Sequence, residues 1–257
     1  MINPSVRKAT PGRGLEHLKV TLQHVLKRWP AVLQRRHYLQ AISQDEDLRK
    51  ALIHTYAAHV HNTLHAALSV DLLRDIGALI LDRDPKSASL AQAVAALKTD
   101  AIRQSLRDTY AADHKSHLDH RLPSVLSRIE LNLLSTPCAH TIRTIRNKAV
   151  AHYDVDHDGK NWKMWDLTEV GLTYGQLDQY IDGCTEAVDG LCGLVLRQVF
   201  SFDALPKVSE TYVQEYIAAL VIGLKSQKEA NEARRAENLS QLHVLSQSDV
   251  SDDSPNS

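Results

Sequence analysis

The sequence predicts an all-α fold, a bundle of antiparallel helices, from three observations. Ala, Leu, Gln, Arg and Lys dominate, whereas glycine (10) and proline (8) are sparse for 257 residues, a balance that favours helices. Apolar residues recur at spacings of three and four along several segments. Strand-type alternation never exceeds a few residues, and there is no convincing internal repeat. We therefore expect one helical bundle with extra helices at its N- and C-terminal ends.

The first part of the chain is expected to hold an arm and two helical regions. Residues 1–13 read as a flexible arm, with proline and glycine among basic residues. A helix is predicted over 15–28, where Pro30 breaks or restarts it, and a second helical pattern runs to Ile42. Ser43, with Glu46 three residues on, fits a capping box before a long helix over 45–81.

The remaining elements follow from proline, serine and threonine positions. Asp84-Pro85 ends the long helix, Pro123 and Pro137 open later helices, and Thr173 and Ser209 cap two more. Helices are thus expected over residues 87–97, 100–112, 123–134, 137–153, 173–200 and 209–235. The domain prediction is one helical domain over 14–240, with its core at about 45–200, followed by a disordered acidic tail over 241–257.

Charge and cysteine content exclude several classes of protein. The formal net charge is −1, so any contact with RNA must come from a local basic patch. Cys138, Cys184 and Cys192 form no CxxC pair, which indicates free thiols in a reducing compartment. The N-terminus lacks the apolar core of a signal peptide, and no run of 18 apolar residues exists. A cytoplasmic protein without membrane contact is expected.

Arg146 and His152 are the candidate catalytic residues, on the helix predicted over 137–153. Six residues separate them, which is roughly 120° of rotation and roughly 9 Å along a helix axis. They therefore flank a groove rather than stack as i,i+4 neighbours do. Two copies facing each other across a twofold axis would line one cleft with two arginines and two histidines, so a homodimer is expected.

These residue types suit RNA cleavage without a metal or cofactor. A histidine of near-neutral pKa can take the proton of the 2′-hydroxyl and supply one to the 5′-oxygen. An arginine can hold phosphate oxygens through two parallel hydrogen bonds and offset developing charge. Asn147 can bind a phosphate or orient the arginine. The product would carry a 2′,3′-cyclic phosphate.

The string Arg146-Asn-Lys-Ala-Val-Ala-His152 resembles the R-x(4–6)-H motif of the HEPN superfamily. RNKAVAHYD resembles the abortive-infection U (AbiU-like) branch, as does the order Leu81-Asp82-Arg83 then Ser89-Leu90. The resemblance covers roughly residues 45–200. It implies a helical bundle that dimerises, and in many members a metal-independent RNase of a phage-defence or toxin system, with an antitoxin or other defence protein as possible partner.

The resemblance also sets the expected roles of the neighbouring residues. Asn147, Arg143 and Lys148 are expected to bind RNA, and Tyr153 and Asp154 to support the site. Another branch carries a modifiable tyrosine two residues past the histidine. Asp154 occupies that position here, so this regulation is not expected.

Three alternatives remain open at this point. Some HEPN proteins are non-catalytic modules that bind RNA, a nucleotide or a partner protein. Asp154, Asp156, Asp158 and Gly159 fit the start of an EF-hand loop, but its twelfth position is Trp165 instead of a bidentate glutamate. Histidine groups also suggest metal binding, although the pair at i,i+4 lacks the glutamate of zinc proteases. These histidines are His54, His61 and His65, and His114, His117 and His120.

Overall fold

The computed structural model describes residues 11–147, 155–157, 162–164, 171–198, 200, 202 and 204–248. These residues are helical apart from their connections and one short hairpin, which confirms the all-α class. The elements are α1 (Pro11–Gln44), α2 (Glu46–Leu52), α3 (Ala57–Ile76), the π-helix η1 (Gly77–Leu81), α4 (Leu90–Leu97), α5 (Asp100–Asp108), α6 (Ala112–Ile129), the π-helix η2 (Glu130–Leu134), α7 (Pro137–Ile145), β1 (Val155–His157), β2 (Trp162–Met164), α8 (Tyr174–Leu196) and α9 (Ala204–Ser248).

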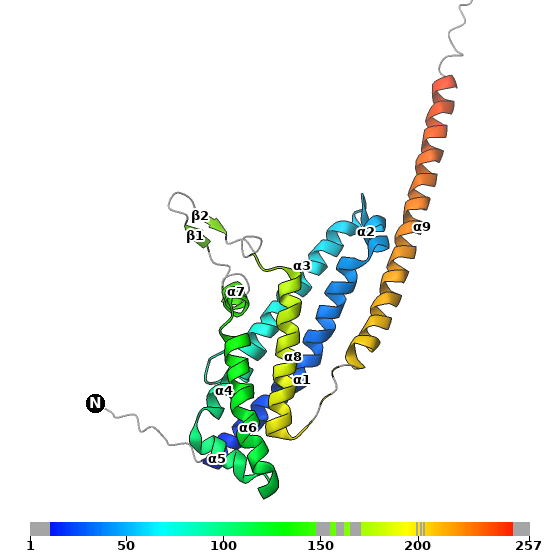
Figure 1. Ribbon diagram of the computed structural model, residues 1–257. Helices are drawn as coiled ribbons and strands as arrows, with labels where there is room; N and C mark the ends of the chain where they lie inside the picture. Colours follow the sequence, from blue (N-terminus) through cyan, green and yellow to red (C-terminus); the bar gives the residue numbers. More distant parts are fainter. Residues whose placement is uncertain are drawn as a thin grey trace, which may run out of the picture.

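The long helix α1 is the axis around which the others pack. It contacts α3, α4, α5, α8 and α9, while α7 rests on α3, η1 and α8 (Figure 1). The main hydrophobic core lies between these helices and draws on every one from α1 to α8 except α2. A second, smaller cluster joins α2 to the first half of α9. Within the described ranges, no helix combines the length and apolar character needed to cross a membrane.

Pro30 does not interrupt α1, contrary to the sequence prediction. A proline inside a helix costs about 3 kcal/mol because it removes one hydrogen bond and crowds the preceding turn. Trp29, Val32 and Leu33 beside it are all buried, and each such side chain contributes about 1.5–3 kcal/mol. The Trp29 Nε1 also donates to Thr185 Oγ1 on α8 at 3.0 Å. Packing therefore outweighs the proline.

Other boundaries also differ from the prediction. Pro123 lies within α6, flanked by buried leucines, rather than opening a helix. Ser209 lies within α9, which begins at Ala204. The predicted capping box at Ser43 is also wrong, because Ser43 belongs to α1 and Asp45 caps α2 by accepting from Leu48 N at 2.6 Å. His54, with a left-handed φ of 61°, then separates α2 from α3.

Two predicted helix starts are confirmed. Thr173 caps α8 through a complete capping box with Gln176, and Pro137 is at the start of α7, where Thr136 caps the helix by accepting from Ala139 N. The predicted end of this second helix, at Tyr153, lies outside the described residues. The three cysteines are free.

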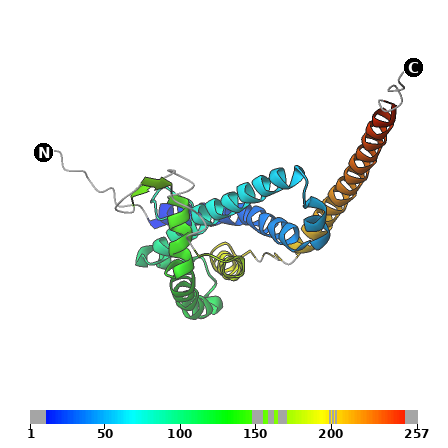
Figure 2. The same ribbon diagram turned by 90° about the horizontal axis from the view of Figure 1, so that it is seen from above.

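Helix α9 differs from the rest in how little of it is buried. Val213, Ile217, Val221 and Leu224 pack against Leu48 and Leu52 of α2. From Lys225 to Gln241 every residue is exposed. This distal half extends away from the bundle in both views (Figures 1 and 2).

The segment that resembled a calcium loop contains a small hairpin instead. Strands β1 and β2 pair antiparallel, with Asp156 opposite Lys163. An EF-hand loop winds around its ion so that alternate residues point inward. Paired, extended backbone at the second to fourth positions of the loop does not match that winding.

Candidate functional site

Arg146 follows the last residue of α7, at a point where the helix widens into a π turn. Its Nη2 donates to Asp82 Oδ2 at 2.9 Å, across a sequence separation of 64 residues. The side chains are partly buried, at 30% and 20% exposure. Asp82 itself follows the π-helix η1. Such π turns occur often at functional sites, and here one lies at each end of the ion pair.

The path of the Arg146 side chain depends on Gly77, the first residue of η1. A Cβ at Gly77 would meet Arg146 Cδ at 2.8 Å, closer than packed atoms allow. The absence of a side chain at Gly77 therefore gives Arg146 its route across α3 to Asp82. The helix η1 thus begins with Gly77, which leaves room for the Arg146 side chain, and is followed directly by Asp82, which pairs with it.

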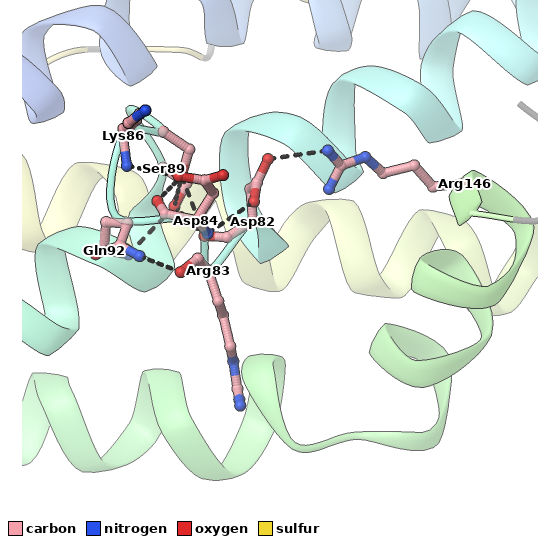
Figure 3. A network of polar contacts seen from close by, with 8 residues as sticks. Asp82, Arg83, Asp84, Lys86, Ser89, Gln92 and Arg146 are labelled. Atoms are coloured by element: carbon pink, nitrogen blue, oxygen red, sulfur yellow. Dashed lines mark hydrogen bonds and ion pairs between the residues drawn. The ribbon is translucent and has the colours of Figure 1, made fainter. Parts of the chain in front are cut away.

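A network of hydrogen bonds fixes Asp82 (Figure 3). The other carboxylate oxygen, Oδ1, accepts from Asp84 N at 3.0 Å. The buried Ser89 donates through Oγ to the Asp82 carbonyl at 2.5 Å and caps α4 by accepting from Gln92 N. Gln92 in turn donates to the Arg83 carbonyl at 2.5 Å. One carboxylate oxygen and the backbone carbonyl of Asp82 are held by other groups, so Arg146 meets an acceptor that is already oriented.

Two further arginines lie beside this corner. Figure 3 shows the Arg83 side chain leaving the turn in a different direction from Asp82, which faces Arg146. Arg143, one turn before Arg146, donates through Nη2 to the Leu134 carbonyl at 2.9 Å. Burial and then the positive charge of Arg83 lower the pKa of Arg143. The two guanidinium groups are thus near enough to repel each other.

Open hydrogen-bonding capacity remains on these arginines. In the described part of the chain, Arg146 uses one nitrogen of its guanidinium, Arg83 uses none, and the buried Nε of Arg143 lacks a partner. Unpaired buried donors are rare in folded proteins. Three positive side chains with free donors at one corner favour a ligand that is negatively charged and rich in acceptors, such as a phosphate.

The structure places some of the predicted site residues and not others. Arg143 and Arg146 lie at this corner, and Asn147 is exposed beside them. Lys148, His152, Tyr153 and Asp154 lie outside the described residues. The pairing of Arg146 with His152, and the predicted RNA contacts, therefore stay predictions.

Asp82 and Gly77 were not among the predicted site residues. The resemblance had singled out the Leu81-Asp82-Arg83 segment, but as a corner between helices. A conspicuous signal was present: acidic, basic and serine residues crowd the turn Asp82-Arg-Asp-Pro-Lys-Ser, directly after a buried apolar helix. Gly77 carries no such signal.

The described residues contain no site that is arranged to bind a metal ion. No group of three His, Cys, Asp or Glu side chains there is arranged to hold an ion. His65, one of the histidine candidates, instead contacts Ser43 Oγ at 3.0 Å and Tyr174 OH at 3.4 Å through Nε2.

Comparison with known proteins gives one family. The family model HEPN_AbiU2, described as AbiU2, matches residues 16–216. The chain belongs to the AbiU2 family of HEPN domains. No curated protein and no solved structure matches it. The family match covers the whole Asp82–Arg146 corner and begins in α1, well before the region in which the sequence resemblance was noted.

Proposed function

We propose that the protein is a metal-independent endoribonuclease of a phage-defence or toxin–antitoxin type system. The observation that carries the proposal is the arginine corner: Arg146 is held by Asp82 through one nitrogen, and its other donors have no partner among the described residues. A planar guanidinium has five N–H donors, so one edge stays open to two phosphate oxygens. Membership of an abortive-infection family gives the biological setting.

In the proposed reaction, His152 takes the proton of a ribose 2′-hydroxyl, and the oxygen attacks the adjacent phosphorus. Arg146 stabilises the pentacovalent phosphorane through its free donors. The P–O5′ bond then breaks, and the leaving oxygen receives that proton back from His152, while the arginine that holds the phosphate comes from the second copy in a composite dimer site. The products are a 2′,3′-cyclic phosphate and a 5′-hydroxyl. Asn147, Arg143 and Lys148 position the RNA.

The test is cleavage of a mixed-sequence RNA in EDTA. We expect Arg146→Ala to reduce the rate by about 10²–10³-fold and His152→Ala by about 10²–10⁴-fold. Arg49→Ala and His114→Ala serve as controls, since both side chains are well exposed and far from α7 in the sequence. Wild-type cleavage rates in both site variants would refute the proposal.

Co-expression tests the composite site. A mixed dimer of one Arg146→Ala chain and one His152→Ala chain retains one arginine and one histidine in the shared cleft. We expect it to regain activity that neither homodimer has. A co-expressed pair that stays inactive would refute the composite dimer site. It would not refute cleavage by a site formed within one chain.

A non-catalytic HEPN module is the second candidate. The Arg146–Asp82 ion pair favours it, since a structural arginine needs no reaction to explain it. This alternative predicts binding of RNA, a nucleotide or a partner protein without cleavage, and no dependence on His152.

A further inference from the structure

A cavity of about 440 Å³ lies between α1, α3, α7 and the start of α8. Its walls are apolar and come from residues of all four helices: Leu39, Leu73, Ile145 and Leu177. These four side chains are buried. Polar side chains gather at one side, where His65, Ser69 and Tyr174 line the opening. An apolar cavity with a few convergent polar groups is the usual form of a small-molecule site.

The polar side of the cavity is organised by hydrogen bonds. His65 Nε2 contacts Ser43 Oγ at 3.0 Å and Tyr174 OH at 3.4 Å. Tyr174 OH also contacts Ser69 Oγ at 3.4 Å. The two rings meet edge to face, with centroids 5.9 Å apart. Burial lowers the pKa of His65, so the ring is neutral at pH 7 and offers one donor and one acceptor nitrogen.

The cavity adjoins the arginine corner on two elements. Ile145, which lines the cavity, immediately precedes Arg146. Leu73, which also lines it, lies one helical turn before Gly77, the residue against which Arg146 Cδ packs. One turn of helix is about 5.4 Å. The Arg146 side chain continues from Gly77 to Asp82, so its guanidinium lies beyond the cavity wall, on the side of η1.

We propose that this cavity binds a nucleobase of the RNA whose phosphate Arg146 holds. The proposal rests on the proposed function and adds a base-recognition site to it. A base has flat apolar faces, which suit the leucine and isoleucine walls, and polar edges, which suit Ser69, His65 and Tyr174. Ile145 of the cavity wall directly precedes Arg146, so one RNA strand can reach both the cavity and the arginine. A purely aliphatic ligand would leave the polar side unused.

Separate titrations with nucleosides and with phosphate distinguish the cavity from the arginine corner. Adenosine, guanosine, cytidine and uridine are titrated one by one and followed by NMR, and inorganic phosphate is titrated separately. We expect at least one nucleoside to bind, and Tyr174→Ala to weaken it on the order of 10-fold through a lost hydrogen bond to the base edge. Arg146→Ala should leave nucleoside binding unchanged and abolish phosphate binding. Tyr212→Ala, which removes an exposed tyrosine of α9, is the control.

Two further variants test the cavity in case Tyr174→Ala fails to fold. Val70→Trp fills the cavity and should abolish nucleoside binding. Ser69→Ala removes one hydroxyl and should change which base binds best. Its matched control is Ser105→Ala, because both hydroxyls donate to the carbonyl four residues earlier at 2.9 Å. Nucleoside binding that is equal in wild type, Val70→Trp and Tyr174→Ala would overturn the proposal.

Cleavage of a random-sequence RNA connects the cavity to the reaction. We expect wild type to prefer one base beside the cut, and Ser69→Ala and Tyr174→Ala to flatten this preference while raising KM more than they lower kcat. Arg146→Ala should instead remove cleavage at every sequence. Cleavage whose base preference ignores both cavity variants would overturn the base site and leave the nuclease intact. Nucleoside binding at the cavity without any cleavage would refute the nuclease alone.

Discussion

Arg36 and Arg146 both pair with aspartates of other helices, and they differ in how many of their nitrogens are used among the described residues. Arg36 of α1 donates through Nε to Asp178 at 3.0 Å and through Nη1 and Nη2 to Asp182 at 2.5 and 3.3 Å. Its side chain is 14% exposed. Burial alone would lower the pKa of Arg36, but the two aspartates raise it. Among the residues that the structure describes, Arg146 has one such bond, to Asp82.

The difference separates Arg36, which joins two helices, from Arg146, which the proposed function assigns to a phosphate. Arg36 connects α1 to α8 and has every nitrogen paired, so a phosphate would have to displace a carboxylate to bind it. Arg146 is oriented by Asp82 and still has donors to offer. An ion pair alone therefore does not indicate function, and the proposed function rests instead on the donors of Arg146 that have no partner among the described residues.

The largest expected effect on stability is that of Arg36→Ala. Removing it leaves two carboxylates close together without their partner, which costs about 2 kcal/mol of unfolding free energy. For a chain of this size the melting temperature should fall on the order of 5 °C. Calorimetry and the RNA-cleavage assay are the measurements, and cleavage per folded molecule should not change. A variant as stable as wild type would show that the paired arginine contributes little.

Asp82→Asn should affect cleavage instead. The amide keeps the shape and an acceptor oxygen but loses the charge that orients Arg146, so we expect a fall in kcat of about 10-fold, equivalent to about 1.4 kcal/mol. Asp75→Asn, which alters the Arg35 ion pair between α1 and α3, is the control. Similar losses in both variants would mean that Asp82 acts only through the fold.

Gly77→Ala should have a smaller effect of the same kind. The new Cβ forces Arg146 Cδ to move from its position at 2.8 Å. We expect a loss of cleavage of about 3- to 5-fold, below 1 kcal/mol, measured as kcat at saturating RNA. Gly223→Ala is the control, because a Cβ at Gly223 meets nothing within 4 Å. It should be neutral in cleavage and slightly stabilising, since alanine favours helices.

The smallest effect is expected at an exposed ion pair. Lys19 and Glu16 meet at 3.1 Å on the surface of α1, and Glu16 is 69% exposed. Exposed pairs of this kind contribute little because water screens them. Lys19→Gln should therefore leave the melting temperature and cleavage unchanged. A fall comparable to that of Arg36→Ala would contradict the distinction drawn between buried and exposed pairs.

The sequence predicted local features better than long-range ones. Thr173 and Pro137 act over one helical turn, so their roles could be read from spacing alone. Pro30 and Pro123 could not, because burial of their neighbours decides whether a helix tolerates them. The Arg146–Asp82 pair joins positions 64 residues apart, and periodicity gives no register between two helices. His54 adopts a left-handed conformation that is uncommon for residues other than glycine, and its neighbours in the sequence give no sign of it.

The exposed half of α9 has a consequence for how the chain behaves in solution. Between Lys225 and Gln241 each turn is held by its own backbone hydrogen bonds with no covering core, and isolated helices of this length are marginal in water. Amide protons there should exchange with deuterium much faster than those near Val213 and Ile217, which pack on α2. Slow exchange along that half would show that a partner covers it. The exchange rate of these amides therefore measures whether this end of the molecule is bound.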